Sequence, residues 1–249
     1  AAQASHAVDF KAKGVWLASF QYGQNGNFTN GGHTGYDPSE DEFEARSRVR
    51  LVIDAVADEN LSGQVYFEIG KSIWGKAEDP QGGMAMGADK NIVKLKRAFI
   101  DWRVPDTDLK LRMGIQGIQL PNVAGGSAVF DDDVAGVVAS YQFNENVGLT
   151  TFWARPYNDN YAARADRTNY QDNMDLFALM VPLTFDGVKV TPWVMYAAMG
   201  PGMFGDKDSK FGASWSPVKK GMQSGFKGTD WNDSYGNAFW AGVTGEVTY

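Results

Sequence analysis

Cysteine is absent from this chain of 249 residues, which excludes disulfide bonds, thiolate metal sites and cysteine nucleophiles. Histidine is scarce, because His6 and His33 are the only two in the chain. They leave little material for a histidine metal cluster or a catalytic relay. Basic residues are outnumbered, with 23 Lys and Arg against 30 Asp and Glu and a formal net charge of -7. Nucleic acid is therefore not expected as a partner, since its binding depends on neutralising phosphate groups.

Long hydrophobic runs are also missing, and no segment approaches the ~18 apolar residues that a membrane-spanning helix needs. The mean hydropathy of -0.34 is slightly polar. A transmembrane β-barrel is polar on average too, because only alternate residues of each strand face lipid. Small residues over 1–7 resemble the end of a secretory signal. The mature chain is therefore expected to be exported by means of a cleaved signal peptide.

The main positive signal is a strict alternation of apolar and polar residues. Over 8–22, one parity carries Trp16 and Phe20, while the other carries Lys11 and Lys13. A period of two over this length indicates a β-strand with two unlike faces. Aromatic rings at both ends of such a strand are typical of anchoring at two membrane interfaces.

The segment 42–55 alternates more sharply, with apolar side chains on one parity and a ladder of Arg46, Arg48 and Arg50 on the other. A dozen alternating residues would span roughly 40 Å at ~3.3 Å per residue. That exceeds the usual strand of ~5–6 residues in a soluble domain. A strand of this length with one charged face fits a water-filled barrel better than a sandwich.

The rest of the chain continues this pattern of strands and connections. Further strands are expected over 63–69, 97–104, 109–116, 134–143, 147–155, 174–184, 188–199 and 238–249. Short turns at 57–61, 105–108, 144–146 and 185–187 alternate with long polar segments at 23–41, 71–91, 118–133, 157–173 and 200–237. Outer-membrane barrels have short turns at one end and long loops at the other. The sequence therefore predicts an all-β fold, an antiparallel transmembrane β-barrel with about ten strands in this chain.

Five segments of the sequence resemble a known family, the outer-membrane homotrimeric porins of sulfate-reducing bacteria. These segments are 8–14, 43–54, 97–102, 131–136 and 147–159. The resemblance implies the outer membrane of a Gram-negative bacterium, with its lipids and lipopolysaccharide as surroundings. It also implies a homotrimer of barrels, each with its own pore, and a third loop, 117–133, folded inward to narrow the channel.

The resemblance implies a barrel of about sixteen strands, more than the ten or so expected in this chain. Residues 1–249 are therefore expected to form a single outer-membrane barrel domain that is the N-terminal part of a larger barrel. A complete, narrower barrel is the alternative, because ten is also an even number of strands.

The arginine ladder is the first candidate for the pore lining. A basic wall facing an acidic loop creates a transverse field that biases ion selectivity, and Asp131, Asp132 and Asp133 end the third loop. Further candidates for the same wall are Arg97, Arg103, Lys110 and Arg112. The alternative is a solvated polar face on which the arginines pair with Glu44 and Asp54.

No catalytic, cofactor or metal site is predicted. Glycines over 200–205 match a dinucleotide-binding pattern, but no helix follows that could hold the pyrophosphate. Acidic residues such as Asp206 and Asp208 could bind calcium, but their spacing is not that of an EF-hand loop. Tryptophans in the long loops could stack on sugars or hold loops together; these are Trp74, Trp215 and Trp231.

The leading interpretation is a porin, a non-enzymatic channel without cofactors for passive diffusion of small hydrophilic solutes and ions. One alternative is an outer-membrane barrel hydrolase, which needs catalytic groups gathered at the barrel rim. The other is a soluble, secreted β-sandwich that acts as a carbohydrate-binding module. That alternative requires the apolar parity to be buried between two sheets.

Overall fold

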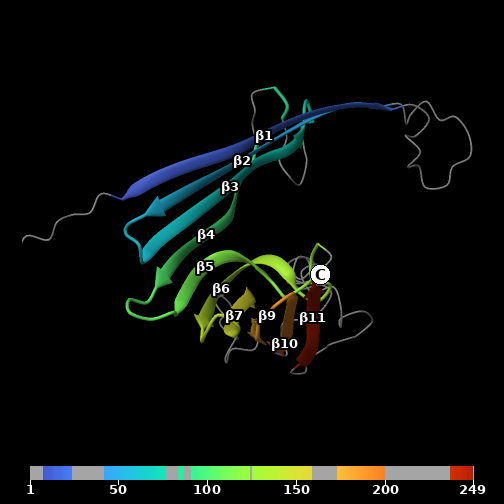
Figure 1. Ribbon diagram of the computed structural model, residues 1–249. Coiled ribbons are helices and arrows are strands. Elements are labelled where there is room, and N and C mark those ends of the chain that lie inside the picture. The colour runs from blue at the N-terminus through green and yellow to red at the C-terminus, as the bar shows by residue number, and fades with distance from the viewer. Residues whose placement is uncertain are drawn as a thin grey trace, which may run out of the picture. The chain divides into compact units, whose positions relative to one another are not determined.

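The computed structural model describes residues 8–23, 42–76, 84–86, 91–123, 125–158, 173–199 and 236–248. Their strands belong to one 11-stranded sheet, in which the registers between neighbouring strands are antiparallel (Figure 1). Among these described residues there is no helix long and apolar enough to cross a membrane. The predicted all-β antiparallel fold is confirmed.

The strand order follows the chain. The strands are β1 (Asp9–Gly23), β2 (Glu42–Val56), β3 (Leu61–Ile73), β4 (Val93–Arg103), β5 (Lys110–Gln119), β6 (Asp131–Gln142), β7 (Gly148–Asn158), β8 (Asn173–Met180), β9 (Leu183–Phe185), β10 (Val188–Met199) and β11 (Gly236–Val247). Neighbours run from β1 to β8 and then to β10 and β11, while short β9 pairs only with β10. In the described structure β1 and β11 are not paired with each other, so the sheet is not closed as a barrel.

Short and long connections alternate along the chain, as predicted. The third long connection is shorter than expected, however, because β5 and β6 extend the ladder beyond the predicted loop ends. Gly117 pairs with Asp133, and Gln119 pairs with Asp131. The predicted loop 117–133 therefore reduces to 120–130, and Asp131, Asp132 and Asp133 belong to a strand.

The strand predicted over 174–184 is interrupted at Val181 and Pro182, which separate β8 from β9. Proline has no backbone N–H and cannot donate to a sheet ladder. Its carbonyl still accepts a hydrogen bond from the Gly148 N–H at 3.0 Å. The interruption raises the strand count from the expected ten or so to eleven.

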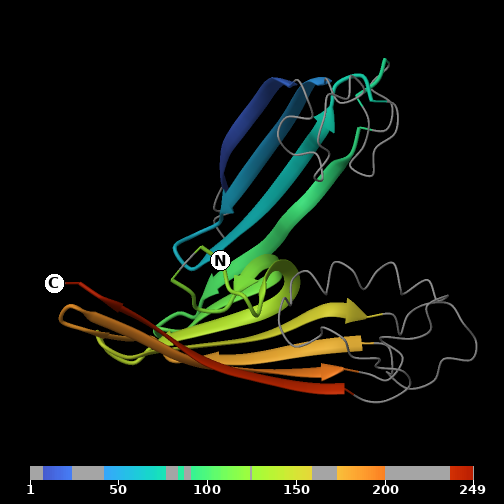
Figure 2. The ribbon, with the colours of Figure 1, turned by 90° about the vertical axis from the view of Figure 1, so that its right-hand side faces the viewer.

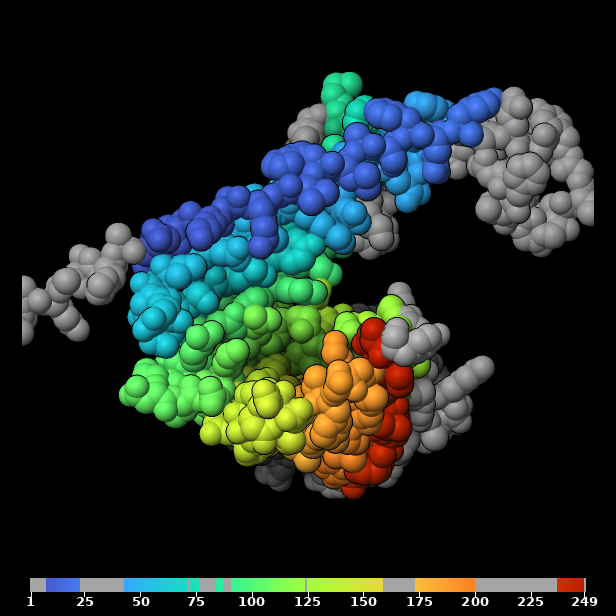
Figure 3. All heavy atoms as spheres, viewed as in Figure 1, coloured from blue at the N-terminus to red at the C-terminus, as the bar shows by residue number. Residues whose placement is uncertain are grey.

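The chain divides into two compact units, which are described separately. The N-terminal unit comprises Asp9–Ala55 and Gln64–Lys96, and the C-terminal unit comprises Val56–Gly63 and Arg97–Tyr249 together with Ala1–Val8. In the C-terminal unit, the strands coloured yellow to red run side by side (Figure 2). Orange β10 and red β11 lie against each other at the edge of this unit (Figure 3).

Strand register gives the sheet of the C-terminal unit two unlike faces. One face carries a cross-sheet row of large apolar side chains, with one on every strand from β4 to β11 except β9. This apolar row is Ile100, Met113, Val137, Trp153, Phe177, Tyr196 and Phe239. Phe177 is 47% exposed and Phe239 is 67% exposed. Within the described structure, the face that bears this row is covered by no second sheet.

The opposite face, here called the mixed face, is polar on β4 and β5 and apolar on β8 and β10. Its apolar part contains Met174, Leu176 and Met195, all fully buried. The connection 120–130 joins this cluster through Leu120 and Phe130, and the Phe130 and Phe152 ring centroids are 6.2 Å apart. The core of the unit therefore lies where the third connection meets the sheet.

Candidate functional site

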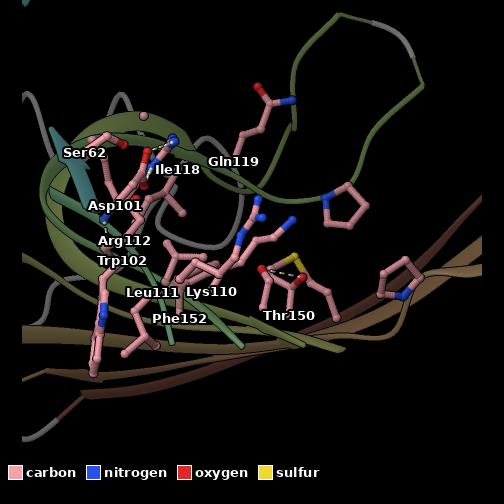
Figure 4. A pocket seen from close by; sticks show the side chains of 18 of the residues that line it. Ser62, Asp101, Trp102, Lys110, Leu111, Arg112, Ile118, Gln119, Thr150 and Phe152 are labelled. Carbon is pink, nitrogen blue, oxygen red and sulfur yellow. Dashed lines mark hydrogen bonds and ion pairs between the residues drawn. The ribbon is translucent and has the colours of Figure 1, made fainter. Parts of the chain in front are cut away.

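A cavity of about 690 Å³ lies on the mixed face of the C-terminal unit (Figure 4). It is lined by polar side chains of β4 and β5, by Ser140 and Thr150 of β6 and β7, and by apolar residues such as Ile118, Phe152 and, from the third connection, Pro121. Arg103, Lys110 and Arg112, all predicted for the pore wall, lie in its lining. The structure therefore gathers part of the predicted basic wall around one cavity.

Arg112 forms a two-point ion pair with Asp101, its register partner on β4. The Arg112 Nε donates to Asp101 Oδ1 at 2.6 Å, and Nη2 donates to Oδ2 at 2.8 Å (Figure 4). The guanidinium also lies 4.1 Å from the centroid of the Phe99 ring, in cation–π geometry. Paired hydrogen bonds of this kind fix both side chains, so this position of the wall is electrically neutral.

Arg103 and Lys110 are also register partners, at the two ends of the turn between β4 and β5. Both side chains are exposed. Among the ion pairs between described residues, none involves either of them. Because both residues line the cavity, they concentrate positive charge there. Like charges directly opposite each other also destabilise a sheet.

Arg97 pairs with Asp133, which brings a predicted basic residue to the predicted acidic run. The Arg97 Nε donates to Asp133 Oδ1 at 2.7 Å. Asp131 and Asp132 are exposed, and Asp132 Oδ1 accepts from the Asp133 backbone N–H at 2.7 Å. Neither Arg97 nor Asp133 lines the cavity.

In the N-terminal unit, two residues of the arginine ladder form ion pairs with carboxylates. Arg46 forms a two-point ion pair with Glu44, and Arg50 Nε donates to Glu68 Oε2 at 2.7 Å. Arg48 is half-buried. Pairing of Arg46 with Glu44 matches the alternative expected from the sequence, whereas Asp54 bonds with other residues, Lys13 at 3.2 Å and Gln64 at 2.6 Å. The ladder and the acidic run 131–133 belong to different units, so a field between them stays a prediction.

The third connection is ordered by its own hydrogen bonds. The Leu120 N–H donates to the Phe130 carbonyl at 3.0 Å, which closes the base of the segment. Asn122 Oδ1 accepts from the Gly126 N–H at 2.9 Å, and Ser127 Oγ accepts from the N–H groups of Val129 and Phe130. Gly126 has a φ of 138°, a conformation that side chains disfavour. These hydrogen bonds join the described residues of the segment, 120–123 and 125–130, to one another.

A polar cluster that the sequence did not reveal lies at the end of β7 and the start of β8. The Asp175 carboxylate accepts from Arg155 at 2.8 and 2.9 Å, from Trp153 Nε1 at 2.7 Å and from Asn173 at 2.7 Å. Asp175 is buried. A buried carboxylate requires such partners. Arg155 lies within a shift of register between Ala154 and Tyr157, so the alternation along β7 does not predict that it meets Asp175.

The remaining predicted features are divided between described and undescribed residues. Trp74 packs against Phe20 at 5.4 Å between ring centroids and donates to Ser47 Oγ at 3.0 Å. It therefore fastens its connection to the N-terminal unit. Within the described ranges, no group of three or more His, Asp and Glu residues is placed to hold a metal ion. Residues His6, His33, 200–205, Asp206, Asp208, Trp215 and Trp231 lie outside the described ranges.

Comparison of the sequence with known proteins identifies no family. No protein-family model matches the sequence, and no curated protein matches it significantly.

Proposed function

We propose that the chain forms the wall of an outer-membrane pore through which small hydrophilic solutes and ions diffuse passively. The observation that carries the proposal is the apolar row. On strand after strand of one sheet, its large apolar side chains are exposed to the surroundings, as with Ile100, Phe177 and Phe239. Soluble proteins rarely expose an apolar patch that spans many strands, whereas a lipid-facing barrel wall requires one.

The mixed face supports the same proposal from the other side of the sheet. Its charged side chains and its cavity would border water, while the apolar row would border lipid. Because lipid offers no hydrogen bonds, every backbone group of the wall must pair within the sheet. The proposal therefore includes closure of the sheet into a barrel, either by pairing of its outer strands or through further strands.

The third connection is proposed as the constriction. Leu120 and Phe130 hold both of its ends on the mixed face, and Pro121 lines the cavity. A loop fastened there would narrow a water-filled lumen without blocking it. Assembly as a homotrimer in the outer membrane of a Gram-negative bacterium, among lipids and lipopolysaccharide, belongs to the same proposal.

The proposal is tested by purifying the full-length protein in detergent and reconstituting it into planar lipid bilayers. We expect ohmic current steps, grouped in threes for a trimer, with a reversal potential in a salt gradient that gives the sign of selectivity. A folded, detergent-bound protein that leaves bilayers silent would overturn the proposal. Hydrolase assays on the same preparation would then test the barrel-enzyme alternative.

A second prediction uses the absence of native cysteine. Ala139 and Ser140 are neighbours on β6, and their side chains point to opposite faces of the sheet. Ala139 pairs with Leu111 on the apolar side, whereas Ser140 lines the cavity. In liposomes we expect Ser140→Cys to react with a water-soluble maleimide at least about tenfold faster than Ala139→Cys, because lipid shields the apolar face.

Denatured samples of both variants serve as the control and should react alike. Equal reaction rates in liposomes would argue against a lipid-facing sheet. The sandwich alternative also expects Ala139→Cys to be protected, but without detergent or lipid. It further requires a second sheet, and all described strands belong to one.

A further inference from the structure

A second cross-sheet row, on the mixed face, combines cations with hydroxyl groups. Arg103 on β4 pairs with Lys110 on β5, Lys110 with Ser140 on β6, and Ser140 with Thr150 on β7. All four residues line the cavity. Figure 4 shows Lys110 extending toward the part of the cavity where Thr150 lies. This cation–hydroxyl row therefore presents its four polar groups to one space.

The charges around the row leave it with a positive excess. Two carboxylate residues line the cavity, Asp101 and Glu59. Arg112 engages both oxygens of Asp101, and Glu59 is exposed in the turn between β2 and β3. Arg103 and Lys110 thus face a single carboxylate that no arginine holds.

The donors of the row match the needs of a small oxyanion. A guanidinium binds two oxygens of one anion with a fixed fork, and an ammonium adds a compact charge. Hydroxyl groups can donate to a third oxygen, and the Ser140 and Thr150 hydroxyls lie 3.1 Å apart. An anion between Arg103 and Lys110 would also relieve the repulsion between them.

We infer that the cation–hydroxyl row binds a small phosphate-like oxyanion. The ligand is a soluble anion rather than a lipid headgroup, because the row lies on the face opposite the apolar row. This site lies beside the turn between β4 and β5, in the cavity that Pro121 of the third connection also lines. The inference deepens the proposed function by naming a class of solute that the pore would bind. As a statement about a pore solute, the inference rests on the proposed function.

The test is titration of inorganic phosphate into the full-length protein in uncharged detergent, by calorimetry at constant ionic strength. We expect saturable binding that Arg103→Gln and Lys110→Gln each weaken about tenfold, as for the loss of one charge-assisted hydrogen bond. The Lys110→Arg variant should retain binding and shows that the site tolerates a conservative change. Lys189→Gln is the matched control, since Lys189 is an exposed lysine of β10 outside the cavity.

Binding that does not saturate, or that Lys189→Gln weakens as much as Lys110→Gln, would overturn the inference. Displacement of phosphate by a short-chain phosphatidic acid would assign the site to a headgroup and overturn the soluble ligand. The bilayer recordings separate this inference from the pore. Current steps without phosphate binding would reject the site alone, and phosphate binding without current would reject the pore alone.

Discussion

Replacing Gly114 by valine is expected to lower the free energy of unfolding by about 3 kcal/mol, from backbone strain and steric overlap together. Gly114 has a φ of 128°, a conformation that β-branched residues do not adopt at low cost. A Cβ there would lie 2.8 Å from the Phe99 Cα and would also overlap the Ala98 carbonyl. These atoms are backbone atoms of β4, so they could move only if the β4–β5 ladder shifted.

The measurement is urea unfolding in detergent micelles, followed by tryptophan fluorescence. Gly245→Val on β11 is the matched control, because a Cβ at Gly245 would meet only the Lys189 carbonyl at an ordinary 3.8 Å. That control should unfold within about 0.5 kcal/mol of the wild type, as most surface substitutions do. A Gly114→Val protein as stable as this control would show that the β4–β5 ladder lacks the described geometry. Loss of the ladder would also misplace Arg112 and Lys110, so this prediction bears on the site as well.

Strand positions were predictable wherever the two faces of a strand differ in chemistry. β4 and β5 alternate between apolar and charged residues, and their register places Trp102 opposite Leu111 and Asp101 opposite Arg112. On β8 the alternation fails as a signal, because Leu176 is buried on one face while Phe177 is exposed on the other. A strand that is apolar on both faces has no period of two to read.

The candidate site was predictable as a set of residues but not as a set of contacts. Arg103, Lys110 and Arg112 were expected on one wall, and the structure places all three around one cavity. Whether the charge of each residue is neutralised depends on register, which pairs Arg112 with a carboxylate and Arg103 with another cation. Register between strands is set by the packing of the whole sheet, so no local pattern could have separated a neutral pair from a charged one.

The end of the third connection was misjudged for a related reason. A run of three aspartates reads as a polar loop, yet Asp133 lies in β6, where it pairs with Gly117 and its carboxylate accepts a hydrogen bond from Arg97. The buried anchor of the connection is Phe130, immediately before the run. Its burial depends on Phe152 and the buried methionines of β8 and β10, which are distant in the sequence.

Replacing Phe130 by alanine is expected to lower the free energy of unfolding by about 3–5 kcal/mol, the usual cost of emptying a large aromatic site in a core. Phe130 is only 2% exposed, and its ring packs on Phe152. Val123→Ala is the control in the same connection, since Val123 is 72% exposed and should cost less than about 0.5 kcal/mol. Urea unfolding of both variants in micelles gives the comparison.

The same substitution separates a structural anchor from a pore constriction. If the third connection narrows a lumen, releasing its anchored end should raise the single-channel conductance, or make the current fluctuate between levels, under conditions in which Phe130→Ala is still folded. The Val123→Ala channel should conduct like the wild type, because the hydrogen bond between Leu120 and Phe130 and the buried anchor both remain. If Phe130→Ala is destabilised but its conductance is unchanged, the buried cluster around Phe130 has only a packing role. The constriction would then lie elsewhere. An altered conductance with unchanged stability would mean that Phe130 lies at the lumen surface, contrary to its burial.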